Sequence, residues 1–460
     1  MHYVIPFEPP KVFGLSDEDQ VALDALVAQW SARRPRNHER LGYLDLKTKL
    51  KDLGAAMPPE LVQQLEVVVG WPQKAVDELA NRIILDGFAG NDQNPMGLGD
   101  MLEANRFTVE FPQAVTSALS QSLAFITTTP DDDKGALIQF HSALWATGLW
   151  SRSSRALTAG LVVTDADRLG RPTRLMLLVP GEVVACAAGA NGWYIESVTP
   201  TGLGGRIPME PLPFRPTLER WAGRSRIDRG VMSMTDRAMR GAARLDVHSE
   251  LFTALKLILL GVSDEAFAKS KWSFLVDRVN TLTKDEDGDL PRLEKISAES
   301  PEPHIAVMRQ LAAEFSGHTG VPLGSLGIAT DNPESAGAKQ EARQDIVGHA
   351  EAQHIIFGSA LKRSFGTALM IRDGLSEPPA ELTGLGLAWR PPNRPTLSAL
   401  ADAGAKQVQA VPDLARTSVG LELVGLSPQQ IERYRAEFAE QAPVGVESLA
   451  AAIARQSAEG

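Results

Sequence analysis

The sequence predicts an α+β fold, and three stretches carry the prediction. Residues 331–374 have the apolar spacing of a long helix, whereas residues 136–215 consist of short apolar runs separated by Gly, Pro and Asp. Runs of that kind are typical of strands in a mainly antiparallel sheet. Residues 216–322 add two further helices with a small α/β insert between them.

The long helix is predicted to begin in a polar loop, where Asp331 or Asn332 can cap it. Pro333 suits the first helical position, and Glu334 suits the positive end of the helix dipole. Gly374 supplies the stop. The stripe between them reads as one uninterrupted helix, far longer than the average, and it includes a histidine: Ile346, Ala350, His354, Phe357, Leu361, Phe365 and Leu369.

Shorter helices and a turn are predicted ahead of the sheet. A first helix opens at Ser16 and ends in the basic residues 33–36, with an apolar face of Val21, Ala25, Leu26 and Trp30. A second begins at residues 58–59 and runs through Leu65 and Val68, and a third begins at Trp71-Pro72. Residues 86–88 are a predicted turn, and residues 98–125 a further helix that passes into strand at 125–129.

Five runs are predicted to be strands: residues 136–140, 159–163, 173–179, 182–185 and 193–198. The proline-rich residues 208–216 are a predicted extended linker. Behind the sheet, a strand at 385–389 and a helical tail are expected, with a helix face of Leu397, Leu400, Ala401 and Val408. Ser427 to Gln430 form a capping box, and residues 450–453 a last short helix.

The helix after the linker has apolar positions from Ile227 to Leu245. Its other surface carries interleaved charges, which usually means a salt-bridged surface and only weakly a DNA-binding face. These charged residues are Arg220, Arg224, Arg226, Arg229, Arg237, Arg240 and Arg244 with Asp228, Asp236 and Asp246. In the insert, residues 255–260 are a predicted strand, and residues 278–282 face residues 290–296 across an Asp-Gly turn. A helix from Ser300 to Phe315 follows.

Composition limits the class of protein. The 460 residues suggest two to four domains, and no apolar run has the length of a membrane span. The start of the chain has no secretory signal pattern. The net charge of −11 argues against gripping nucleic acid over the whole surface, but it does not exclude DNA sliding past. The one cysteine, Cys186, is predicted to be a small buried hydrophobe.

No pattern predicts catalytic or metal-binding residues. The chain has no Gly-Lys pair for a phosphate-binding loop and no Gly-x-Ser-x-Gly elbow. His349 and His354 are five residues apart, which is wrong for two ligands on one helix face. The acidic residues 131–133 are better explained as a solvated turn, and residues 285–289 depart from calcium-loop spacing. No cofactor is therefore expected.

Short motifs nevertheless stand in a specific order between residues 41 and 438. They are Val69-Gly70-Trp71-Pro72, Asp86-Gly87-Phe88, Asn105-Arg106-Phe107, Gly205-Arg206-Ile207-Pro208, Gly223-Arg224-Ser225, Asp285-Glu286-Asp287-Gly288, Ser300-Pro301-Glu302-Pro303-His304, Gly320-Val321-Pro322 and Asp331-Asn332-Pro333 with Ser335-Ala336. Each motif alone is weak. Their order and spacing together resemble the portal proteins of long-tailed bacteriophages, particularly those of phages that infect actinobacteria.

The resemblance implies the parts of a portal subunit. Residues 1–215 and 336–394 would form the wing, residues 216–250 and 301–322 two stem helices, and residues 251–300 an α/β clip. Residues 323–335 would form the tunnel loop and residues 395–460 a helical crown. The implied channel residues, which include no cation, are Thr330, Asp331, Asn332, Pro333, Glu334 and Ser335. The implied partner-binding clip residues are Trp272, Asp285, Glu286, Asp287 and Asp289.

Portal proteins of this kind form a dodecameric ring at one capsid vertex, through which the genome is packaged and ejected. The resemblance therefore implies a homo-oligomer with double-stranded DNA, the terminase large subunit, a head–tail adaptor and the major capsid and scaffolding proteins as partners, and neither a membrane nor enzymatic activity. It implies location in the virion, and in the host cytoplasm during assembly. Two alternatives stay open: another virion structural or head–tail connector protein, and a metal-dependent nuclease or hydrolase.

Overall fold

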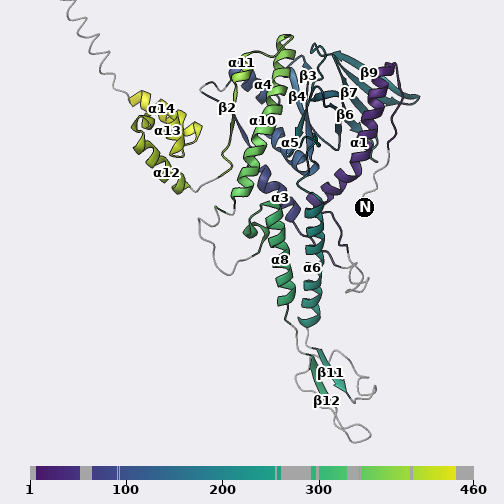
Figure 1. Cartoon of the computed structure of the whole chain (residues 1–460), viewed down its shortest axis with the longest axis vertical. Helices are drawn as coiled ribbons and strands as arrows, with labels where there is room; N and C mark the ends of the chain where they lie inside the picture. Colours follow the sequence, from purple (N-terminus) through teal and green to yellow (C-terminus); the bar gives the residue numbers. More distant parts are fainter. Residues whose placement is uncertain are drawn as a thin grey trace, which may run out of the picture. The chain divides into compact units, whose positions relative to one another are not determined.

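The structure is a computed structural model that describes residues 7–51, 65–90, 92, 94–253, 256–260, 292–296, 300–328, 341, 343–393 and 397–441. Its contacts define two units, Met1–Pro392 and Asn393–Gly460. Helices and largely antiparallel sheets give the predicted α+β class (Figure 1). Within the described ranges, no helix combines the length and the apolar character that crossing a membrane requires.

The larger sheet has six strands in the order β1 (Val12–Phe13), β9 (Gly192–Pro200), β8 (Glu182–Gly189), β7 (Pro172–Val179), β6 (Ala156–Ala166) and β5 (Ala146–Ser151). β1 pairs in parallel with β9, and the other neighbours are antiparallel. Alternate side chains such as Leu175 and Leu177 face helix α1 (Asp17–Leu44), which covers them with Leu26 and Trp30. Cys186 is buried in this core, as predicted, and burial raises the pKa of its thiol to about 11.

A three-stranded sheet covers the opposite face, in the order β10 (Met209–Pro213), β3 (Leu123–Asp131) and β4 (Gly135–Ser142). Phe125 and Met209 pack there against Val162 and Leu178 of the larger sheet. The second face of this small sheet lies against helices α5 (Phe107–Gln121) and α10 (Gln344–Asp373). The first unit is therefore layered, with helices outside two packed sheets (Figure 1).

The largest core joins α3 (Trp71–Ala80), α4 (Leu98–Ala104), α5 and α10. Phe107 stacks on Phe111 with ring centroids 5.2 Å apart and approaches Phe365 of α10 at 5.8 Å. The predicted stripe of α10 is buried in full, and Gly374 ends the helix at φ +65°. η1 (Pro95–Gly97) precedes α4, and α11 (Glu381–Gly384) leads into β13 (Gly386–Trp389), which pairs with β2 (Leu85–Ala89).

Helices α6 (Arg229–Thr253) and α8 (Glu302–Thr319), the predicted stem helices, lie side by side and leave the layered part together (Figure 1). Between them in sequence, β11 (Lys256–Leu260) pairs antiparallel with β12 (Arg292–Ile296). η3 (Leu323–Leu326) follows α8.

The second unit contains α12 (Leu397–Ala410), η4 (Pro412–Arg416), α13 (Ser418–Leu423) and α14 (Pro428–Gln441). The predicted capping box is confirmed: Gln430 N–H donates to Ser427 Oγ at 3.3 Å and Ser427 N–H donates to Gln430 Oε1 at 2.8 Å. A Cβ on Gly404 would lie 2.2 Å from the Leu423 carbonyl oxygen, so only glycine lets α12 approach the end of α13 this closely.

The first helix was predicted wrongly in two respects. It continues through Pro35 to Leu44 instead of ending at residues 33–36, because buried Arg34 donates to the Gly170 carbonyl at 2.6 Å and lies over the Trp30 ring. Val21 and Ala25 are exposed, and the buried face is Leu23, Leu26, Val27 and Trp30. The predicted apolar face was thus displaced around the helix.

Several element boundaries also differ from the predictions. Residues 86–88 belong to β2 and are not a turn, and residues 209–213 are strand β10 and not a linker. The helix predicted for 98–125 breaks at Arg106, whose φ is +54°, and ends at Gln121. β5 was not predicted. β2 and β10 each pair with a partner distant in sequence, which local patterns do not show, whereas β5 pairs with its neighbour β6 in the chain.

Other predictions fall wholly or partly outside the described residues. α10 begins at Gln344 with Arg343 in a turn, so the predicted helix is not uninterrupted, and its predicted cap at 331–334 lies outside. The second predicted helix is not found at residues 65–70, which are not helical. Its predicted start at residues 58–61 lies outside the described residues. β12 pairs with β11, whereas its predicted partner, residues 278–282, lies outside the described residues, as do residues 450–453.

Candidate functional site

Both predicted sites lie outside the described residues. These are the channel residues Thr330 to Ser335 and the clip residues Trp272, Asp285, Glu286, Asp287 and Asp289. The structure does describe the framework from which both segments leave, namely α6, α8, η3 and the start of α10. We call the place where α6 begins and α8 ends the stem junction, residues 225–231 and 315–321.

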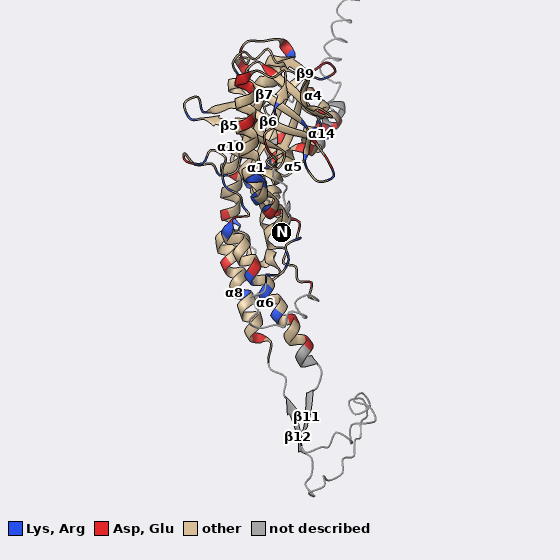
Figure 2. Cartoon of the chain, turned by 90° about the vertical axis from the view of Figure 1, so that its right-hand side faces the viewer, with Lys and Arg blue, Asp and Glu red and all other residues tan. Residues whose placement is uncertain are grey.

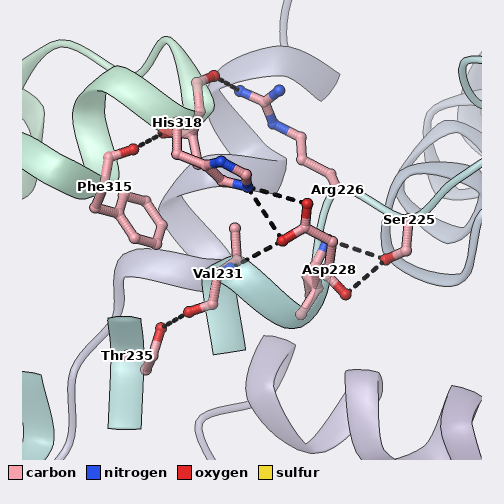
Figure 3. Close-up of polar contacts among 9 residues, drawn as sticks. Ser225, Arg226, Asp228, Val231, Thr235, Phe315 and His318 are labelled. Atoms are coloured by element: carbon pink, nitrogen blue, oxygen red, sulfur yellow. Dashed lines mark hydrogen bonds and ion pairs between the residues drawn. The ribbon is translucent and has the colours of Figure 1, made fainter. Parts of the chain in front are cut away.

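Arg226 lies at the centre of the stem junction (Figure 3). It is 7% exposed, and its Nη2 donates to the Thr319 carbonyl at 2.8 Å while its Nε donates to the Ala75 carbonyl of α3. Its backbone N–H donates to the Leu119 carbonyl at 2.7 Å. Burial lowers the pKa of the guanidinium to about 10. One residue thus joins the start of α6 to α3, α5 and the end of α8.

Two short side chains fix the first turn of α6. Asp228 Oδ1 accepts the Val231 N–H at 2.9 Å, which is the bond of an N-cap. Ser225 Oγ accepts the Ile227 N–H at 2.9 Å and donates to the Ser120 carbonyl, so the chain turns sharply into the helix. His318 Nε2 of α8 lies 3.0 Å from Asp228 Oδ2 (Figure 3). The cap of one stem helix is therefore also a contact with the other.

Below the junction the two helices meet in an antiparallel register. Arg237 Nη1 lies 2.8 Å from Glu314 Oε2, and a Cβ on Gly241 would lie 2.8 Å from Met308 Sδ. Residue numbers rise along α6 as they fall along α8. Basic and acidic residues are interspersed along both helices (Figure 2). The pair is thus held by close packing and a charged rim.

The predicted tunnel loop starts from an anchored base. Gly320 ends α8 at φ +70°, and a Cβ there would lie 3.2 Å from Asp345 Cβ near the start of α10. Leu326 is buried, and Trp71 Nε1 donates to its carbonyl at 3.3 Å. The Trp71 ring also lies 5.4 Å from that of Phe315. The chain therefore leaves α8 close to the place where it re-enters α10.

The end of α1 and the segment after it are tied to α6 by a three-residue network. Tyr43 Oη donates to Asp236 Oδ1 at 2.7 Å, and Lys51 Nζ lies 2.9 Å from Asp236 Oδ2. Lys51 Nζ also donates to Tyr43 Oη at 2.7 Å. The network holds this segment against the part of α6 that lies nearest the layered part of the first unit.

α10 adds polar contacts behind the junction. Gln353 Nε2 donates to the Pro213 carbonyl at 2.9 Å and its Oε1 accepts the Arg215 N–H at 3.3 Å. His354 Nε2 bonds to the Arg82 carbonyl at 3.0 Å and its ring stacks on Trp389, with burial lowering its pKa. His354 is thus a paired core histidine, in keeping with its place on the apolar stripe.

The junction is built for positioning. Its polar groups bond to backbone carbonyls and to helix ends. These bonds fix the direction in which α6 and α8 leave the layered part of the first unit. Across the part of the chain that the structure describes, no group of three or more His, Cys, Asp or Glu side chains is placed to hold a metal ion.

Charge pattern alone misassigned part of this junction. The prediction of a salt-bridged surface holds for Arg237 with Glu314 and for Asp236 with Lys51. The prediction is wrong for Arg226, which is buried and donates hydrogen bonds to backbone carbonyls. One signal was available: if Asp228 is an N-cap, the helix begins at Arg229 and Arg226 lies outside it.

Comparison with known proteins gives sequence relatives. No family model matches the chain. The chain is 26% identical over 404 residues to the portal protein of Mycobacterium phage D29, a match that covers 84% of this chain and 81% of that protein. It is 26% identical over 425 residues to the portal protein of Mycobacterium phage L5, covering 88% and 85%. Mycobacteria are actinobacteria, so the predicted resemblance is confirmed.

Two solved structures are similar at a lower level. One is the neck of a native GTA particle computed with C12 symmetry, at 13% identity and a TM-score of 0.40, covering 78% of this chain and 90% of that one. The other is the neck of an empty GTA particle computed with C6 symmetry, at 14% identity and a TM-score of 0.37, covering 77% and 83%.

Proposed function

We propose that this chain is the subunit of a portal ring at the unique vertex of a bacteriophage capsid. The observation that carries the proposal is the similarity to two portal proteins over 84% and 88% of the chain, which is too extensive for one shared module. The stem framework supports it, because the two segments that would contact DNA and partners are inserted at opposite ends of the α6–α8 pair.

In this proposal twelve copies form a ring, and double-stranded DNA passes through its channel during packaging and ejection. The tunnel loop, residues 330–335, surrounds the DNA. The clip, with Trp272 and the acidic residues 285–289, docks the terminase large subunit and later the head–tail adaptor. The wing and crown meet the major capsid and scaffolding proteins. Assembly takes place in the host cytoplasm, and the ring stays in the virion.

Electron microscopy of the purified chain tests the proposal. Negative-stain class averages should show closed rings with a central channel, and light scattering should give a mass of several subunits across a range of concentrations. A species that stays monomeric at every concentration in virion-like salt would overturn the proposal.

The same preparation separates the alternatives. Mg²⁺-dependent cleavage of plasmid DNA would favour a nuclease. Labelling of assembled particles at many positions on the capsid, in place of one vertex, would favour another virion structural protein.

A further inference from the structure

The ends of the stem helices farthest from the junction bring two histidines together. His248 on α6 and His304 on α8 have ring centroids 5.2 Å apart, with planes inclined at 65°. Both side chains are half-buried. The two residues are remote in sequence, so histidine spacing along one helix gives no sign of this pair.

Helix packing holds the two rings in place. The contact line of α6 and α8 runs from Arg237 and Glu314 through Gly241 and Met308 to this pair. His248 and His304 continue the same antiparallel register, so their approach follows from the packing of the two helices.

We propose that His248 and His304 together bind one divalent transition-metal ion such as Zn²⁺, each helix supplying one imidazole. Two imidazoles on a tetrahedral zinc ion have centroids about 5 Å apart, because each Zn–N bond is about 2.1 Å long and lies in its ring plane. The observed separation of 5.2 Å meets this requirement. Neutral imidazole is a ligand that Zn²⁺, Ni²⁺ and Cu²⁺ all accept.

Water fills the remaining coordination positions, so the ion binds more weakly than in a structural site with four protein ligands. Its effect is a cross-link between α6 and α8 near the points where the chain enters and leaves the 254–299 insert. The ion sets the spacing between those two points. The site lies within one chain, so it exists whether or not rings form, and its test is independent of the proposed function.

Zn²⁺ titration of the metal-free, purified full chain by calorimetry is the first test. The wild-type chain should bind one Zn²⁺ in a step that both His248→Ala and His304→Ala lose. His38→Ala, on α1, is the matched histidine control and should retain the step. One imidazole alone holds the ion poorly, so each single variant should already have lost the step. The double variant should therefore bind Zn²⁺ as weakly as either single variant, and no more weakly.

Cu²⁺ electron paramagnetic resonance is the second test, since it counts nitrogen ligands. The wild-type spectrum should show two equivalent nitrogens and each single variant at most one. If an alanine variant proves misfolded by circular dichroism in chelator, His248→Asn and His304→Asn, which keep a polar side chain of similar size, decide the matter. Wild-type Zn²⁺ binding in the folded variants, or no stoichiometric step in the wild-type chain, would overturn the proposal.

Discussion

Arg226 acts through the shape of its side chain. A guanidinium presents its N–H groups as a rigid fork, so it can donate to the Ala75 and Thr319 carbonyls in two directions at once. Lysine keeps the charge but has one compact ammonium group, which would leave at least one buried carbonyl without a partner. Arg226→Lys should therefore lower the free energy of unfolding by about 2 kcal/mol.

Urea denaturation measures this loss from the midpoint at unchanged slope. Arg220→Lys is the control, because Arg220 is exposed and its substitution should change the stability very little. An Arg226→Lys protein as stable as the wild type would show that the two carbonyl bonds contribute nothing.

Tyr43 makes stability sensitive to high pH. Burial raises the pKa of its phenol to about 12, and Asp236 acts in the same direction. Burial lowers the pKa of Lys51, but hydrogen bonds to Tyr43 and Asp236 outweigh it and raise the value to about 12. Between the ordinary values near pH 10 and about pH 12, the folded chain thus holds more protons than the unfolded chain, and stability falls as pH rises.

Tyr43→Phe removes one of these groups and a partner of the other. Its melting temperature should therefore fall less steeply than that of the wild type between about pH 9 and pH 11.5. Tyr434→Phe, at a half-exposed tyrosine of α14, is the control and should keep the wild-type slope. Identical slopes for the wild type and Tyr43→Phe would contradict the network.

The α6–α8 pair depends on one close approach. A Cβ at Gly241 would meet Met308 Sδ at 2.8 Å, and methionine is flexible enough to move aside for a methyl group. Gly241→Ala should consequently be near neutral, because a gain in helix propensity of about 1 kcal/mol offsets the displacement. Gly241→Phe must push the helices apart and should lower the melting temperature strongly.

Thermal unfolding compares these two variants directly. The double variant Gly241→Phe with Met308→Ala opens space on α8 and should recover part of the loss. If Gly241→Phe alone melts like the wild type, the two helices do not pack as tightly as the contact requires.

At the same scale, the sequence predicted elements whose signals are local. The α10 stripe, the helix start at Trp71-Pro72 and most strand runs were identified because a periodicity or a helix-start signal lies within one segment. β2 and β10 were missed because their partners, β13 and β3, are far away in the chain. α1 passes Pro35 because Arg34 and Asn37 bond to carbonyls in turns between strands.

The candidate site was likewise predicted in part from the sequence. The order of stem helix, insert and stem helix could be proposed from the motifs, but the stem junction could not. Arg226 is one of many arginines in its region, and its burial follows from the meeting of α3, α5 and α8 around it. A residue that joins several distant segments carries no pattern of its own.

For the whole molecule, the feature to consider is the anchored base from which the predicted tunnel loop starts. Gly320 and Asp345 nearly touch, and Trp71 holds Leu326, so the described residues on both sides of the predicted tunnel loop are anchored. In the proposed ring, any charge added to this loop is repeated around the channel. The wild-type loop contains no lysine or arginine between residues 330 and 335.

Asp331→Lys and Asn332→Lys test whether this absence serves DNA movement. Each added cation releases about one counterion on meeting a phosphate, and a ring multiplies that attraction. Moving DNA would then have to leave a favourable contact at every step. Both variants should assemble normally yet translocate DNA more slowly, or retain less DNA per head, in a packaging assay.

Asn332→Asp is the control for the helix cap. If residue 332 caps a helix, its replacement by lysine can cost about 1 kcal/mol, whereas aspartate keeps the cap and adds no cation. A packaging defect shared by the lysine and aspartate variants would therefore come from loss of the Asn332 amide, and neither from the cap nor from an added cation. A defect confined to lysine, in a variant with the stability of the wild type, would come from phosphate attraction. Wild-type packaging by both lysine variants in well-assembled heads would mean that residues 330–335 do not face the channel.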